Sequence, residues 1–193
     1  IFRDYQIRTF GKSHSFEFFF QEYRGFYISN SSEVDPAYQG ISDRIIRSDL
    51  VTKHYGVQVI KLFDPKAYSL EANFGHMGRQ KKSADSTFVF VYYDHHEFSA
   101  KTSLVPSSFA ADFPTVSSLR GGTAKTIGIG LGYGGALVIG PLNFGFIAGL
   151  GSGNQQQTID TEEQSFSKNS VTSKILMKLN LGINTEKHAL GLQ

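Results

Sequence analysis

Cysteine and tryptophan are absent from this chain of 193 residues, and charged residues make up only 19% of it. Without cysteine, a disulfide scaffold, a Cys-ligated zinc site and a thiol nucleophile are all excluded. The net charge is only +2, which gives no electrostatic support for a dedicated nucleic-acid-binding protein. No run of about 18 consecutive apolar residues occurs, so we expect no transmembrane helix.

Aromatic residues and glycine, in contrast, are abundant: the chain has 17 Phe, 9 Tyr and 20 Gly. This composition favours strands and turns over helices. The length fits one domain covering residues 1–193, and no linker divides it. The chain opens on Ile1, with neither an initiator methionine nor a signal peptide, so we expect a processed chain or one truncated at its ends.

The clearest pattern is a two-residue alternation in the C-terminal third. From Thr126 to Tyr133, odd positions are large and apolar, and even positions are Gly or Thr. Such alternation puts the large side chains on one face of a strand and the glycines on the other. Residues 142–146 and 174–184 alternate similarly. The large residues that we expect to face lipid are Ile127, Ile129, Leu131, Tyr133, Leu142, Phe144, Phe146, Ile175, Met177, Leu179 and Leu181.

Weaker alternation predicts more strands upstream and at the end of the chain. These segments are residues 16–20, 55–60, 68–75, 88–93 and, as a partial strand, 189–193. Together with the C-terminal segments they give about eight strands, which we expect to cross a membrane at a tilt. The sequence therefore predicts an all-β fold, an antiparallel up-and-down transmembrane β-barrel of about eight or more strands.

The predicted connections alternate between long loops and tight turns. Long polar connections are expected at Asn30 to Asp49, Thr102 to Gly122 and Asn154 to Asn169, and short turns at Asp64 to Lys66 and Gly140-Pro141. This asymmetry is typical of outer-membrane barrels.

The residues opposite the bulky ones suggest an enclosed interior. Glu17, Glu71, Lys174 and Lys178 share those faces with many small residues, and we expect them to form a charge network that fills the lumen without conducting. Glycine-rich faces would gain nothing from packing on a sheet exposed to water. The alternative is a soluble barrel or β-sandwich with the apolar residues inside. A soluble barrel of this kind would carry an apolar ligand.

The best catalytic candidates are His95, Glu97 and Ser99, which share one face of a strand. His95 and Ser99 would then lie roughly 13 Å apart, too far for a nucleophile and its base. An outer-membrane lipid hydrolase would have to recruit its Ser–His pair from neighbouring strands. His95 and His96 point to opposite faces and cannot chelate one metal, so we predict no metal and no cofactor. Polar residues where a strand leaves the bilayer are the simpler interpretation.

Arg79, Lys81 and Lys82 form the only dense basic run. Such a run can hold a lipid phosphate or an acidic partner surface. The simpler interpretation is a solvated hairpin end, because short charge runs usually mark exposed loops.

Several segments resemble an uncharacterised bacterial envelope family that is known only as a domain of unknown function. They are Gly25 to Asn30, Arg79 to Ala84, Leu104-Val105-Pro106 and Gly130 to Tyr133, and the resemblance covers Phe16 to Tyr133. It implies an outer-membrane or periplasmic setting, and it transfers no reaction and no catalytic residues.

The sequence thus predicts a bacterial outer-membrane protein with a structural or partner-binding role in the cell envelope. Its expected partners are membrane lipid or lipopolysaccharide and other envelope proteins, without nucleic acid. The lipid-processing hydrolase and the soluble carrier are the alternative functions.

Overall fold

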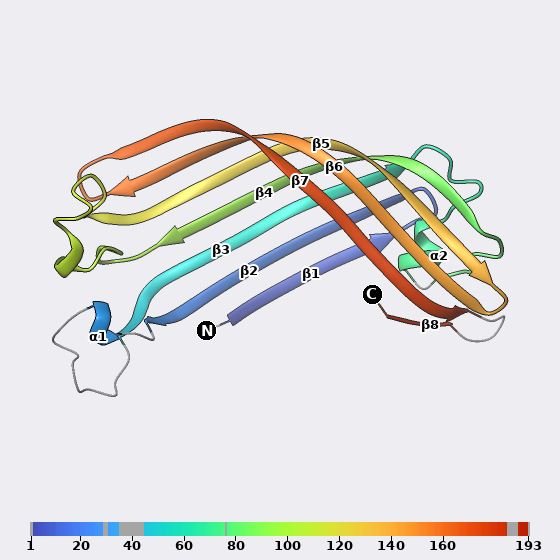
Figure 1. Cartoon of the computed structure of the whole chain (residues 1–193), viewed down its shortest axis with the longest axis horizontal. Coiled ribbons are helices and arrows are strands. Elements are labelled where there is room, and N and C mark those ends of the chain that lie inside the picture. The colour runs from blue at the N-terminus through green and yellow to red at the C-terminus, as the bar shows by residue number, and fades with distance from the viewer. Residues whose placement is uncertain (1, 29–30, 35–44, 76, 185–188, 193) are drawn as a thin grey trace.

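The computed structural model describes residues 2–28, 31–34, 45–75, 77–184 and 189–192. They form one antiparallel sheet of eight strands, in which each strand lies beside its neighbours in the chain (Figure 1). The strands are β1 (Phe2–Phe10), β2 (His14–Ile28), β3 (Ile45–Leu62), β4 (Ala84–Ser99), β5 (Leu119–Ile139), β6 (Leu142–Thr161), β7 (Ser165–Asn184) and β8 (Ala189–Leu192). The all-β class and the up-and-down order are thereby confirmed.

The sheet has two edges in the part of the chain that is described. There β1 pairs only with β2, and β8 pairs only with β7. The structure therefore shows an open sheet and not the closed barrel that the sequence predicts. No helix in these ranges is long and apolar enough to cross a membrane.

The alternation of the sequence sets the two faces of the sheet. Paired residues of neighbouring strands share a face, and the pairs Leu131–Leu150 and Leu150–Ile175 continue one apolar surface across β5, β6 and β7. We call this the outer face. The opposite, inner face carries Phe88, Phe90 and the glycines of β5, and it holds the buried core.

Glycine on β5 makes room for aromatic rings on β4. A Cβ at Gly130 would overlap the Phe90 ring and would lie 2.5 Å from the carbonyl oxygen of Leu150. Gly128 and Gly132 meet the rings of Tyr92 and Phe88 in the same way. The Gly/large alternation of β5 therefore has a packing role, because the missing side chains are replaced by rings from the neighbouring strand.

One predicted strand is a short helix. Residues 68–75 hold α2 (Leu70–Phe74), which Ser69 caps by accepting a hydrogen bond from the Ala72 N–H. The helix contacts β1, β2 and β6, and its Leu70, Asn73 and Phe74 are buried. It thus covers part of the inner face at one end of the sheet (Figure 1).

Other predicted boundaries also differ. The expected loop from Asn154 to Asn169 belongs mostly to β6 and β7, which leaves only residues 162–164 as a turn. The short turn at Asp64 to Lys66 opens a longer connection that contains α2, and β1 was not predicted at all. Most of the expected loop from Asn30 to Asp49 lies outside the described residues, although its end from Ile45 belongs to β3.

The remaining connections follow the prediction more closely. The turn at Gly140-Pro141 joins β5 directly to β6, and the positive φ of Gly140, 58°, is the conformation that a two-residue hairpin turn needs at this position. The region from Thr102 to Gly122 is a connection up to Leu119, where β5 begins, and it contains a 3₁₀ turn at Ser107–Phe109. The separate helix α1 (Ser31–Val34) follows β2.

Candidate functional site

Large apolar side chains are exposed along the outer face of β5, β6 and β7. The exposed fraction is 68% for Ile127, 70% for Leu150 and 77% for Ile175. Of the residues expected to face lipid, Phe146 is half-buried and packs against Tyr133. The exposed ones are Ile127, Ile129, Leu131, Tyr133, Leu142, Phe144, Ile175, Met177, Leu179 and Leu181.

This surface continues as a belt with polar borders. On β6 it runs over the nine residues from Leu142 to Leu150, after which the outer face carries Ser152, Asn154 and Gln156. On β3 the outer residues between Lys53 and Lys61 are Tyr55, Val57 and Val59. We call these outer-face residues of β3 to β7 the apolar belt.

Ion pairs cross the inner face from β7. Lys178 Nζ lies 2.6 Å from Glu17 Oε2 on β2, and Glu17 also pairs with Arg8 of β1 at 2.8 Å. Lys174 Nζ lies 2.8 Å from Asp94 Oδ2 on β4 and 4.3 Å from the centre of the Tyr92 ring. The structure thus brings Glu17 and Lys178 together and pairs Lys174 with Asp94.

Glu71 does not join these pairs. It was assigned to a strand that faces the interior, but it lies on α2 and lines a pocket at the end of the sheet. The sequence did not reveal that Arg8 and Asp94 complete the pairs, because β1 was not predicted and Asp94 follows an apolar strand without an obvious partner.

The proposed catalytic residues do not form a triad. His95 Nε2 is 3.8 Å from Glu97 Oε2, and the His95 ring stacks on Tyr55 at 4.5 Å. Ser99 makes no side-chain hydrogen bond with any residue that the structure describes, and the hydroxyl nearest to the His95 ring is the phenol of Tyr93, 3.5 Å from Nδ1. The serine and the histidine are therefore not in the contact that a nucleophile and its base need. The two neighbouring strands place Lys53 and Lys125 beside this face and supply no serine there.

The adjacent histidines are separated as expected. His96 points to the inner face, where it stacks on His54 with ring centres 3.7 Å apart. Across the described ranges, no three of the His, Asp and Glu side chains gather in a way that could hold a metal ion.

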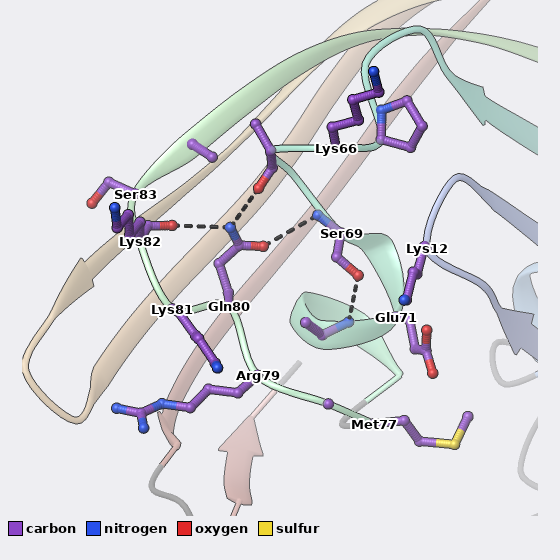
Figure 2. A pocket seen from close by; sticks show the side chains of 15 residues that line it. Lys12, Lys66, Ser69, Glu71, Met77, Arg79, Gln80, Lys81, Lys82 and Ser83 are labelled. Carbon is purple, nitrogen blue, oxygen red and sulfur yellow. Dashed lines mark hydrogen bonds between the residues drawn. The ribbon is translucent and has the colours of Figure 1, made fainter.

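The basic run lies beside a pocket at the end of the sheet that holds α2. Arg79, Lys81 and Lys82 line it from one side, Lys66 comes from the start of the same β3–β4 connection, and Lys12 comes from the β1–β2 connection (Figure 2). The cavity has a volume of about 550 Å³. Sequence reasoning found the first three cations, but it missed Lys12 and Lys66 because nothing local relates them to the basic run.

A buried glutamine fixes the backbone of the basic run. Gln80 is only 6% exposed, and its Nε2 donates hydrogen bonds to the carbonyl oxygens of Ala67, at 2.8 Å, and Lys82, at 2.9 Å. Its Oε1 accepts from the Ser69 N–H at 3.2 Å and from Asn73 Nδ2 at 3.4 Å. These bonds tie the segment to α2 (Figure 2).

In a comparison with family models, residues 2–193 match the model of a domain of unknown function, DUF4421. The chain belongs to this family. The DUF4421 match is wider than the resemblance from Phe16 to Tyr133 and includes all eight strands. No curated protein and no solved structure matches the chain. The interpretation of this DUF4421 domain therefore rests on its own geometry.

Proposed function

We propose that this chain is a β-barrel protein of the bacterial outer membrane, with a structural or partner-binding role in the cell envelope. The observation that carries the proposal is the apolar belt. Side chains such as Leu150 and Ile175, which are 70% and 77% exposed, would meet water in a soluble protein. Soluble monomers rarely expose contiguous apolar patches larger than a few hundred Å².

The dimensions of the belt support a membrane setting. The stretches Leu142 to Leu150 on β6 and Ile175 to Ile183 on β7 each cover nine residues. At about 3.3 Å per residue and a strand tilt of roughly 45°, nine residues span about 20 Å, close to the apolar band of about 25 Å in outer-membrane barrels. Lys53 and Lys61 would then lie near the two membrane surfaces.

Closure of the sheet is part of this proposal. In hydrocarbon, the free N–H and C=O groups of an edge strand would stay unsatisfied, at a cost of several kcal/mol each. Membrane insertion therefore requires β1 and β8 to pair with each other or with further strands. The ion pair between Lys178 and Glu17 supports closure, because it draws β7 toward β2 across the inner face.

The filled inner face favours a structural or partner-binding role over transport. Phe88 and Phe90 are fully buried, and α2 and the two ion-pair groups occupy further interior space. A continuous aqueous channel would have to pass between these groups. The hydrolase alternative receives no support from the site around His95 and Ser99.

Vesicle flotation tests the membrane assignment. Protein refolded with phosphatidylcholine vesicles should float with them in a density gradient and resist extraction with carbonate. In a separate sample without detergent or lipid, it should aggregate. A monodisperse protein in detergent-free buffer that stays at the bottom of the gradient would support the soluble carrier instead and contradict this proposal.

A further inference from the structure

The pocket at the α2 end of the sheet concentrates positive charge. Five cations line it, Lys12, Lys66, Arg79, Lys81 and Lys82, against the single carboxylate of Glu71, which leaves a formal excess of four positive charges. Figure 2 shows Arg79 and Lys81 on the opposite side from Lys12 and Glu71. The cations come from two connections, β1–β2 for Lys12 and β3–β4 for the other four, so the fold and not the sequence alone assembles them.

None of these five cations forms an ion pair with a carboxylate in the described part of the chain. Elsewhere in this protein cations do find such partners, as Lys174 and Lys178 show. Arg79 is also partly buried. Unpaired cations that surround one cavity favour an anion supplied from outside the chain.

The wall that carries these cations is held in place before any ligand arrives. Gln80 satisfies all four of its hydrogen bonds within the protein, and Gly78 has a positive φ of 79°, which permits the turn before Arg79. A fixed backbone lowers the entropy lost when a ligand is bound.

We propose that this pocket binds a phosphate-type anion, either free phosphate or the phosphate of a lipid headgroup. Arginine recognises phosphate oxygens with two parallel N–H donors, and lysines add point charges around it. The volume of about 550 Å³ is large enough for a headgroup and falls within the usual range of small-ligand sites.

The site stands apart from the proposed membrane location. It is built from the connections β1–β2 and β3–β4, beyond the apolar belt, and inorganic phosphate can reach it whether or not the belt contacts lipid. Loss of phosphate binding would therefore leave the membrane assignment intact, and a soluble protein could still bind phosphate.

Calorimetric titration of the full chain in zwitterionic detergent tests the site. The probes are inorganic phosphate and, in a second arm, the short-chain lipid dihexanoyl phosphatidic acid, with dihexanoyl phosphatidylcholine as the zwitterionic comparison. Arg79→Gln/Lys81→Gln removes two pocket cations. The matched control Lys101→Gln/Lys168→Gln removes two exposed cations outside the pocket.

We expect the pocket variant to bind about tenfold or more weakly, and the control to stay within about twofold of the native chain. Arg79→Lys keeps the charge and loses the paired donors, so it should weaken binding by a smaller factor. Binding of phosphate alone identifies the free anion as the ligand, and preferential binding of phosphatidic acid identifies the headgroup. Equal losses in the two double variants, or no binding of either probe, would overturn the proposal.

Discussion

Lys178 Nζ on β7 lies 2.6 Å from Glu17 Oε2 on β2, although five steps of the sheet order separate the two strands. In a flat sheet, five steps of about 4.8 Å would keep these strands roughly 24 Å apart. The ion pair therefore shows that the sheet curls strongly around its inner face. Both side chains are mostly buried, with exposed fractions of 21% and 16%.

Replacing Lys178 by methionine should destabilise the protein. The substitution leaves Glu17 with Arg8 as its remaining partner, and we expect a loss of about 1–3 kcal/mol in the free energy of unfolding. Urea unfolding in detergent micelles measures this change in the free energy of unfolding. Lys168→Met, at an exposed lysine that forms no ion pair with the described residues, is the control and should change stability by less than about 0.5 kcal/mol. Equal stability of the two variants would show that the pair does not help to hold the curl.

Alanine at Gly130 should also be destabilising, for a different reason. The new methyl group would overlap the Phe90 ring and the Leu150 carbonyl oxygen, so we expect a cost of about 1–3 kcal/mol from overpacking. Ser152→Ala changes an outward residue on the neighbouring strand and should be nearly neutral. The Phe90→Leu change should recover part of the loss in the Gly130→Ala background. If Gly130→Ala unfolds at the same urea concentration as the native chain, the packing of β4 against β5 is wrong.

Protonation of Asp49 should weaken the attachment of the β4–β5 connection to β3, and only below about pH 4. Beyond the apolar belt, Asp49 accepts hydrogen bonds from Arg47 and from the N–H groups of Lys101 and Thr102. The hydrogen bond from Arg47 holds the pKa of Asp49 well below its usual value. Because the pKa is lowered on folding, this stabilisation is complete above the ordinary aspartate pKa of about 4 and is lost as the pH falls below it.

Comparison with Asp49→Asn checks this pH dependence. The urea midpoint of the native chain should exceed that of Asp49→Asn by a constant amount between pH 7 and pH 5. The difference should shrink at more acidic pH, as the native carboxyl group becomes protonated. A difference that disappears already between pH 7 and pH 5 would contradict the assigned role of the carboxylate.

A planar lipid bilayer should show no large steady conductance after the protein inserts. The reason is that Phe88, Phe90 and α2 fill the inner face together with the ion pairs. Single-channel recording measures the conductance. A porin of known conductance is the control, because its current steps show that the bilayer accepts an inserted barrel. Large, stable current steps from the native chain would show that a lumen stays open.

The two-residue periodicity was sufficient to predict the strands whose outer residues form the belt. For β5 and β7, alternation put Ile127 and Ile175 on the same face as the other large residues of their strands, because a strand has only two faces. Periodicity wrongly predicted a strand at residues 68–75, where the chain forms a short helix. The signal that was available is Ser69, a typical N-cap residue, directly before the helix-forming run from Leu70. Periodicity also could not foresee that the polar residues 154–161 extend β6, since pairing with β7 stabilises that segment despite its composition.

The candidate sites were less predictable than the strands. Lys178 and Glu17 could be assigned to inner faces, but their contact depends on the curl of the whole sheet. The pocket combines Arg79 with Lys12 from the β1–β2 connection and with the distant Lys66 of its own connection, and that arrangement depends on where Gln80 anchors the loop. Long-range geometry of this kind leaves no local trace in the sequence.

Bromolipid quenching of single tryptophans tests the central claim most directly, because the native chain has no tryptophan. Leu150→Trp places the only indole in the apolar belt, and Gln156→Trp places it on the same face of β6 beyond the belt. In vesicles of phosphatidylcholine with brominated acyl chains, we predict strong quenching of the first and little of the second. Weak and equal quenching of both, in variants that retain the native circular dichroism spectrum, would contradict a lipid-facing belt.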